Sequence, residues 1–457
     1  MASFLERFHL KCPKILLPKP EFQAKWAVVA CDQYTSEPEY WNAVAREVGE
    51  SPSMLHMVLP ELYLDKPEEH AMIPKIHESM RKYLREGVFD EVDGMVYIER
   101  KTRVHPCRRG LMVAMDLEGY EYMRSGPRNS VSSPIRPTEG TIVARIPPRL
   151  RVRLEAPIES PHIMVLIDDP KRMLIEPLGA QKASMEKLYD VELMQNSGHL
   201  TGYRVPASAY SAIEAALTQL SDPAAFQAKY HVGAEVPLLT YAIGDGNHSL
   251  ATAKKRWTDL KEACHTPEEL AHLMATHPAR YALVEICNLY DEGIEFEPIH
   301  RVLFEVSTPI LADMQAHYGP EMTITPAASF EAMIHEVNAS ALQHGPHHAV
   351  GFCDAEGVKV LRLPRGDAHL PVGALQAHLD AFIAKKGAKN IDYVHGDEVI
   401  KTLGSQPHNC SFYLPPMSKH DLFPTVIQNG VLPRKTFSMG HADEKRFYYE
   451  CRAILPM

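Results

Sequence analysis

The sequence has no apolar run long enough to cross a membrane. Its longest runs, such as residues 163–167, have the length of a buried strand, whereas a membrane-spanning helix needs about 20 residues. The first residues mix charged and apolar side chains and lack the small-residue cleavage site of a secretory signal. We therefore expect a cytoplasmic protein that does not bind membranes.

Paired cysteines and metal-binding motifs are also missing. The 8 cysteines are scattered along the chain, which is typical of reduced thiols in a reducing compartment rather than of a disulfide framework. Neither His-Glu-x-x-His nor Cys-x-x-Cys occurs, although the chain has 24 histidines. The sequence therefore argues against a dedicated zinc site.

An excess of positive charge is missing as well. The formal net charge is −10, and there is no basic helix, so the sequence does not favour binding to nucleic acid or to anionic lipid. A small anionic ligand is compatible with this charge, because a local cluster of Arg and Lys can oppose the overall sign. The sequence also lacks internal repeats and low-complexity tracts, and it leaves the oligomeric state open.

The composition is that of a globular protein, with 45% apolar and 23% charged residues, and 457 residues are enough for two or three domains. Short predicted strands and helices alternate, and 36 prolines punctuate them, which indicates an α/β or mixed α+β fold. We predict a core over residues 1–305 and a smaller C-terminal α/β region over residues 306–457. The stretch 123–134 is rich in Ser, Gly, Pro and Asn, which predicts a mobile loop.

The strongest functional signal lies between residues 242 and 253. A predicted buried strand leads into a tight turn, and a helix opens at once near Ser249. Unpaired N–H groups and the helix dipole attract a phosphate to such a helix start. The residues of the turn that we predict to bind a phosphorylated cofactor are Gly244, Gly246, Asn247 and Ser249.

Two side chains of this turn can carry chemistry. His248 can donate a hydrogen bond to a phosphoryl oxygen, and Asp245 can hold Mg²⁺ or act as a base. Simpler interpretations remain open, because Asp245 or Asn247 can merely cap the helix. The turn matches a dinucleotide-binding fingerprint only in part, since Ser249 stands where a third glycine is expected. It is not a Walker loop, because the Lys-Ser/Thr pair is missing.

A second candidate segment, residues 135–145, directly follows the predicted mobile loop. Glu139 can act as a positioned base or a metal ligand, and Arg136 and Arg145 can bind an anion. A solvated pair of Glu139 and Arg145 on a strand is the simpler alternative.

Three more segments place polar residues beside strands or turns. Asp32 directly follows a predicted buried strand, at the carboxyl end where open α/β sheets bind ligands. His300 and Arg301 stand close to two acidic residues around one proline, which suits a site and also suits a charged loop. Lys435 lies in a basic turn.

These five segments occur, in this order, in one known family. The chain resembles the family called domain of unknown function 1015, and the resemblance spans nearly the whole sequence. Two motifs depart from the family pattern: Cys31-Asp32-Gln33 stands where the family usually has Tyr-Asp-Val, and Asp245-Gly246-Asn247-His248-Ser249 stands where it has Asp-Gly-His-His-Arg. The other motifs that carry the resemblance are Glu139-Gly140-Thr141 followed by Arg145, Pro298-Ile299-His300-Arg301 and Pro433-Arg434-Lys435-Thr436.

The signature at residues 245–249 looks like the phosphate-binding turn of the ParB/sulfiredoxin superfamily, which includes kinases of free serine. The resemblance implies a ParB/sulfiredoxin-like nucleotide-binding core, to whose site segment 432–437 returns, and phosphoryl chemistry on a small molecule such as serine or phosphoserine. Asn247 and Ser249 replace the first His and the Arg of the signature. Losing that Arg removes a strong phosphate contact, so the missing positive charge must come from Arg136, Arg145, Arg301 or Lys435.

We predict a phosphotransferase that uses Mg²⁺ with ATP, ADP or another nucleoside phosphate and acts on a small-molecule substrate. Asp245 binds Mg²⁺ or acts as a base, and His248 and the turn hold phosphates. Glu139 activates an acceptor hydroxyl, and Asp32 is a further catalytic carboxylate. A nucleotide-binding regulator without turnover and a small-molecule phosphatase are the alternatives. The carboxylates favour an enzyme, because a pure anion binder gains nothing from extra negative charge.

Overall fold

The computed structural model describes residues 3–122, 133–343 and 345–456, so most of the loop predicted at 123–134 lies outside the described residues. The chain forms two compact units, residues 1–294 with 440–457, and residues 295–439. Both units combine helices with sheets, which confirms the predicted mixed α/β class. No helix in the described part of the chain is long and apolar enough to cross a membrane.

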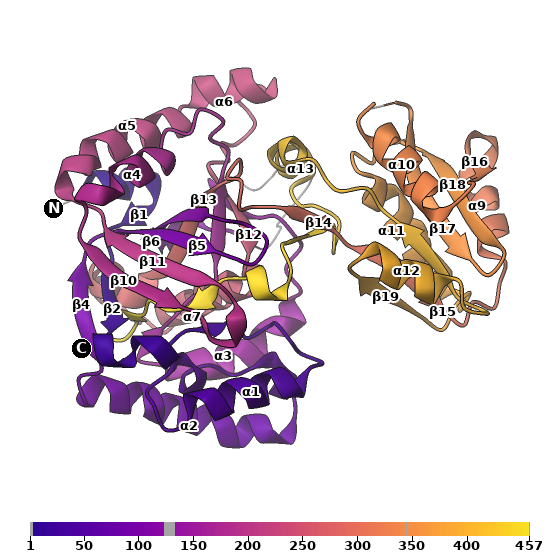
Figure 1. Ribbon diagram of the computed structural model, residues 1–457. Coiled ribbons are helices and arrows are strands. Elements are labelled where there is room, and N and C mark those ends of the chain that lie inside the picture. The colour runs from indigo at the N-terminus through magenta and orange to yellow at the C-terminus, as the bar shows by residue number, and fades with distance from the viewer. Residues whose placement is uncertain (1–2, 123–132, 344, 457) are drawn as a thin grey trace. The chain divides into compact units, whose positions relative to one another are not determined.

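The first unit is built on a mixed sheet of nine strands (Figure 1). In sheet order these are β10 (Lys187–Glu192), β11 (His199–Arg204), β5 (Val96–Lys101), β6 (Arg108–Asp116), β13 (Tyr281–Asn288), β9 (Met164–Ile167), β12 (Tyr241–Asp245) and β7 (Ile135–Pro137), with β1 (Leu10–Lys11) paired to β6. β13 runs parallel to β9, and β12 runs parallel to β7. β9 is buried along its whole length, which explains why it reads as a continuous apolar run.

Helices cover both faces of this sheet (Figure 1). Neighbouring side chains of β5 and β6 alternate between two apolar cores, with Ile98 and Met112 in one and Tyr97 and Leu111 in the other. The first core is covered by α1 (Pro38–Val48), α2 (Pro67–Arg85) and α3 (Ile146–Leu154). The second is covered by α4 (Glu176–Gln181), α5 (Tyr210–Leu220), α7 (Asn247–Glu262) and α8 (Pro267–Thr276), and α6 (Pro223–Tyr230) follows α5.

The last 18 residues belong to the first unit and run through its interior. In this segment β22 (Phe447–Tyr448) pairs with β3 (Val28–Val29), and β23 (Arg452–Ala453) pairs with β8 (Ile158–Glu159). Arg446 is buried between two carboxylates, with Nε 2.8 Å from Glu285 and Nη2 2.6 Å from Glu450. Because each buried charge has an opposite partner, the chain end is held in place rather than left at the surface.

The second unit contains an antiparallel sheet of six strands (Figure 1). In sheet order these are β16 (Thr323–Pro326), β18 (Gly357–Pro364), β17 (His347–Asp354), β20 (Cys410–Tyr413), β15 (His300–Phe304) and β19 (Asn390–Val394). Its helices are α9 (Ile310–Tyr318), α10 (Phe330–Ala341), α11 (Pro371–Ala384), α12 (Asp397–Gly404) and α13 (Leu422–Asn429). A short ladder of β14 (Phe296–Pro298) with β21 (Phe437–Met439) joins the two ends of this unit.

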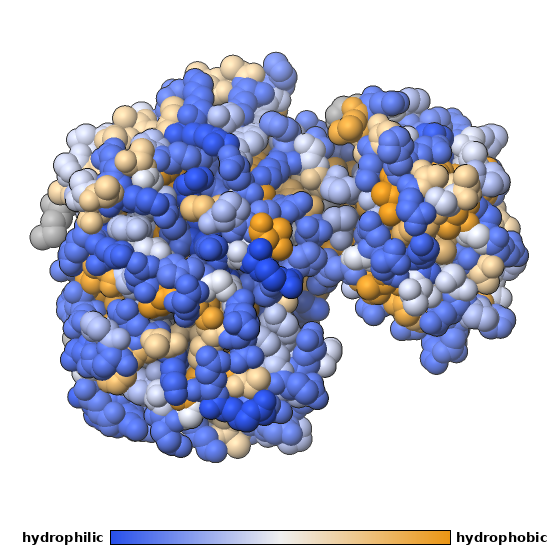
Figure 2. Space-filling model, viewed as in Figure 1, coloured by the Kyte–Doolittle hydropathy of each residue, from blue (hydrophilic) through white to orange (hydrophobic). Residues whose placement is uncertain are grey.

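Figure 2 shows one face of the protein, on which hydrophilic residues predominate and hydrophobic residues are scattered. Scattered exposed apolar side chains are normal for a globular protein. Two of the most exposed, Ile142 at 45% and Val143 at 58%, are neighbours in the segment that follows β7. That segment lies beside the turn with the strongest functional signal, as described below.

Candidate functional site

The turn between β12 and α7 is built around Gly246. This glycine has φ +77°, and a Cβ at its position would lie 2.9 Å from Ile163 Cα, so a side chain would meet the neighbouring backbone. α7 begins directly after it, at Asn247, and its first turn has no side-chain cap hydrogen bond. The Asp245 carboxylate accepts from the N–H of Gly246 instead, at 2.9 Å. The N-cap position is thus held by Gly246 rather than by Asp245 or Asn247, and the binding of a phosphate at this helix start stays a prediction.

The segment after β7 meets this turn. β7 and β12 are parallel neighbours, so their carboxyl ends lie at one edge of the sheet. Thr138 Oγ1 donates to the carbonyl of Ile243 at 2.7 Å, and the N–H of Ile142 donates to His248 Nε2 at 3.2 Å. Glu139 is half-buried. In the chain it lies between Thr138, which bonds to β12, and Ile142, which bonds to α7. In a neutral His248 ring the proton is then on Nδ1.

A lysine from the last segment of the chain places a positive charge beside the turn. Lys445 Nζ lies 3.0 Å from Asp245 Oδ2, and only 9% of the lysine side chain is exposed. Sequence reasoning missed Lys445, because a lone Lys in a stretch of charged residues forms no motif. The missing charge was expected from other residues, yet Lys445 is the cation that the structure places on Asp245.

The same lysine acts on Asp32. Burial opposes ionisation of this carboxyl, but the charges of His162 and Lys445 and a hydrogen bond from Gln33 hold its pKa below the usual value. Asp32 is therefore ionised at neutral pH. The structure thus surrounds Lys445 with two carboxylates that sequence analysis had singled out separately.

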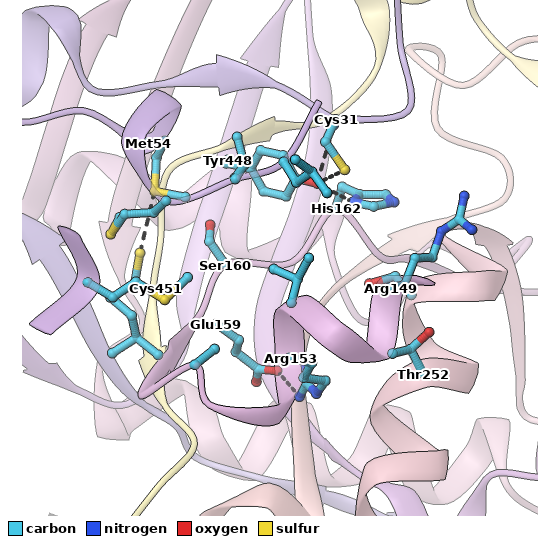
Figure 3. Close-up of a pocket in the computed structure, with 18 of the residues that line it drawn as sticks. Cys31, Met54, Arg149, Arg153, Glu159, Ser160, His162, Thr252, Tyr448 and Cys451 are labelled. Carbon is cyan, nitrogen blue, oxygen red and sulfur yellow. Dashed lines mark hydrogen bonds and ion pairs between the residues drawn. The ribbon is translucent and has the colours of Figure 1, made fainter. Parts of the chain in front are cut away.

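Cys31 lies beside these groups but is not a reactive thiol. Tyr448 Oη lies 3.1 Å from Cys31 Sγ and 2.7 Å from His162 Nδ1 (Figure 3). Burial, together with the negative charges of Asp32 and Glu61, raises the pKa of the Cys31 thiol to about 12. Because the thiolate is the nucleophilic form, this cysteine does not suit nucleophilic catalysis at neutral pH.

A cavity of about 150 Å³ opens next to the start of α7. Ser249 and Thr252 of α7 and Arg149 of α3 form part of its wall, and Arg149 makes an ion pair with Glu61. Figure 3 shows His162, Arg149 and Thr252 on one side of this cavity and Met54 and Cys451 on the other. Its polar groups thus come in part from α7, the helix that follows the turn, and from α3.

Two of the predicted anion-binding arginines differ in their surroundings. Arg136 is buried, and its Nε and Nη2 donate to the carbonyls of Ser133, Pro237 and Leu238 at 2.8, 2.7 and 3.1 Å. Burial lowers its pKa to about 10. Its guanidinium thus anchors main chain at the sheet edge, and its role as an anion ligand stays a prediction. Arg145 is exposed at the start of α3, and its role as an anion ligand stays a prediction.

The remaining candidates, His300, Arg301 and Lys435, belong to the second unit. Arg301 is fully buried and donates to Gln376 Oε1 at 2.8 Å and to the carbonyl of Arg434 at 3.2 Å. His300 is fully buried, accepts from the N–H of Leu414 at 3.1 Å and stacks on a tyrosine. Lys435 is exposed. The contacts of the two β15 residues organise the second unit, and their part in the phosphate site stays a prediction.

Across the described residues, no three His, Cys, Asp or Glu side chains gather as ligands of a metal ion. Mg²⁺ that arrives with a nucleotide needs only one or two carboxylates, because phosphate oxygens and water complete its shell. Asp245 and Asp32 can meet that demand. The residues therefore fit a nucleotide-borne cation and not an all-protein metal cage.

Comparisons with known proteins give one family and two distant structures. The model of the family described as "Protein of unknown function (DUF1015)" matches residues 13–382. SbnI with C-terminal truncation from Staphylococcus aureus is 10% identical, with a TM-score of 0.35 over 72% of this chain and 82% of that one. A free serine kinase (E30A mutant) in complex with ADP is 9% identical, with a TM-score of 0.37 over 75% and 92%. Both similarities are too weak for site geometry to be transferred. No curated protein matches the chain.

Proposed function

We propose that this chain, which belongs to the DUF1015 family, is a nucleotide- and magnesium-dependent phosphotransferase that acts on a small metabolite. One observation carries the proposal: α7 begins without a side-chain cap at a glycine turn whose Asp245 is paired with Lys445. A helix start, a cation and a carboxylate close together are what a phosphoryl group and its metal ion require.

The phosphates of the nucleotide bind at the first turn of α7. Its main-chain N–H groups and the helix dipole attract the negative charge. Ser249 leaves the signature without its arginine. Lys445 adds a positive charge beside Asp245, as a point charge rather than a two-pronged donor. His248, held by the N–H of Ile142, borders the same turn.

The carboxylates bind the metal ion and act as the base. Asp245 or the ionised Asp32 holds Mg²⁺, which neutralises charge on the phosphates. Glu139 follows the neighbouring strand and activates the acceptor hydroxyl as a base. The protein thus contributes position and charge neutralisation, which dominate catalysis of phosphoryl transfer.

A second candidate function is a nucleotide-operated switch without turnover. It is favoured by Asp245, whose two oxygens are already engaged by Lys445 and by the N–H of Gly246. A phosphate that draws Lys445 away from Asp245 would release the end of the chain from the turn. Such a change in contacts is a conformational signal in itself.

Two measurements separate the functions. Calorimetry with ATP, ADP and CTP, with and without Mg²⁺, should show binding of at least one nucleotide, and no binding at millimolar concentration would refute both functions. Incubation with the bound nucleotide, Mg²⁺ and a panel of amino-acid and hydroxy-acid acceptors, including serine and phosphoserine, should yield a phosphorylated product. Nucleotide binding that changes protease sensitivity while no acceptor is phosphorylated would instead identify the switch.

A further inference from the structure

Much of the wall of the cavity beside α7 is apolar. Three methionines, Met54, Met57 and Met80, form part of this wall. The other apolar residues of the lining are Val58, Leu59, Leu64, Val152, Ala156, Ile158 and Ile454. The lining thus combines polar groups of α7 and α3 with methionine and aliphatic surface, and Arg153 and Glu159 also lie along it (Figure 3).

The charged groups around the cavity are paired with each other. Arg149 pairs with Glu61, and Arg153 pairs with Glu159, which also accepts from Arg452 at 2.8 Å. A water molecule is stabilised in a cavity only by several polar partners. Because the interior offers mainly methionine and aliphatic surface, apolar atoms are better occupants than water.

The volume sets the size of the occupant. The cavity measures about 150 Å³, and an aliphatic cavity of about 150 Å³ engineered into another protein stays dry and binds benzene. A phenyl ring or a branched alkyl group of similar size fits this space. The hydroxymethyl side chain of serine neither fills it nor matches its apolar wall.

We infer that this cavity binds the apolar group of a small molecule whose polar end lies at the start of α7. The inference rests on the proposed function only in making that molecule the phosphoryl acceptor. The acceptor class is then a hydroxy acid or amino acid with a hydroxyl group and an aromatic or branched aliphatic side group. The flexible methionine side chains adapt to the shape of that group.

The methionines supply a direct test with benzene as the probe. In protein labelled with ¹³C at the methionine methyl groups, benzene should shift the signals of Met54, Met57 and Met80. The signal of Met333, which is buried in the second unit, is the internal control and should stay in place. Unchanged signals of all three cavity methionines at saturating benzene would overturn the inference.

The affinities of two hydroxy acids, one with and one without a phenyl group, test whether the apolar end of the ligand enters the cavity. 3-Phenyllactate should bind roughly tenfold or more tightly than lactate. The reason is that its phenyl group leaves water for the apolar cavity, whereas lactate has only a methyl group to bury. Equal affinities would contradict the inference. Phenyllactate should also compete with benzene for the methionine shifts.

A substitution that fills the cavity gives a further test. Ala156 lines the cavity, so Ala156→Leu should abolish the benzene shifts without lowering the unfolding temperature. Ala216→Leu is the matched control, because Ala216 is buried in the other core of the unit; it should lower the unfolding temperature and keep the shifts. Benzene shifts that persist in Ala156→Leu would refute the assignment. Benzene binding without any nucleotide binding would refute the proposed function and leave the cavity assignment standing.

Discussion

Lys445 and Asp245 form an ion pair of 3.0 Å although 200 residues of chain separate them. The pair joins the last segment of the chain to the turn that starts α7. Both groups are mostly shielded from solvent, with 9% and 22% of their side chains exposed, so their interaction is screened less than that of a surface pair.

Replacing Lys445 by Met should weaken nucleotide binding. A charge-assisted hydrogen bond to a phosphate is worth about 1.5–3 kcal/mol, so the affinity should fall about ten- to a hundredfold. Calorimetry with the nucleotide that binds the wild-type protein measures the change. Lys255→Met is the control, because Lys255 lies on α7 and pairs with Asp259 near the surface. Equal affinity of Lys445→Met and the wild type would exclude Lys445 from the phosphate site.

Glu139→Gln should separate chemistry from binding. If Glu139 is the base, the isosteric amide should reduce turnover by about 10² to 10⁴. The affinity for nucleotide should change little, because a base acts mainly in the transition state. Steady-state kinetics together with calorimetry give the two quantities. Glu262→Gln, at the exposed end of α7, should alter neither. A parallel loss of affinity and rate in Glu139→Gln would instead indicate a ligand of the nucleotide or its metal ion.

Gly246→Ala should destabilise the first unit. The substitution places a side chain at φ +77° and brings its Cβ to 2.9 Å from Ile163 Cα. Gly87→Ala is the control, since its φ is +65° and the added Cβ would meet only Lys19 Nζ at 3.7 Å, an ordinary contact. The control should lose about 1 kcal/mol of unfolding free energy from backbone strain alone. Denaturant unfolding should show a larger loss for Gly246→Ala, and equal losses would mean that the Ile163 backbone yields without cost.

His199 should make stability depend on pH. Partial burial opposes its protonation, but hydrogen bonds to Asp190 at Nε2 and to Glu192 at Nδ1 raise its pKa above 6.5. A histidine whose pKa is raised by folding stabilises the protein fully below the unfolded pKa, and this contribution is lost as the pH rises through the folded pKa.

The His199→Asn variant tests this direction. It should lower the urea midpoint relative to the wild type at pH 5.5, and the difference should shrink by pH 8.5. His272→Asn, at an exposed position, is the control and should show no such trend. A difference that grows with pH would contradict the assignment of a protonated His199 between two carboxylates.

Local sequence predicted the strand, the glycine turn and the helix that follows, because each depends on neighbouring residues. Gly246 adopts the left-handed conformation that glycine allows, and an apolar run precedes it. The helix begins two residues earlier than the position predicted at Ser249, because Gly246 itself ends the turn. The adjacency of Glu139 to this turn requires only that β7 and β12 be parallel neighbours, which an α/β pattern favours.

The sequence did not reveal which cation pairs with the turn or what lies beside it. Lys445 reaches Asp245 because residues 440–457 return through the first unit and pair with β3 and β8, and no local pattern encodes such long-range pairing. Arg136 could be assigned to the backbone only once its depth in the sheet edge was known. The cavity likewise collects side chains from α2, α3, α7 and the chain end, so its volume results from packing rather than from any segment. Local preference and residue type were enough to predict the strand, the turn and the helix, whereas contacts between distant segments set the charge partner of the turn and the space beside it.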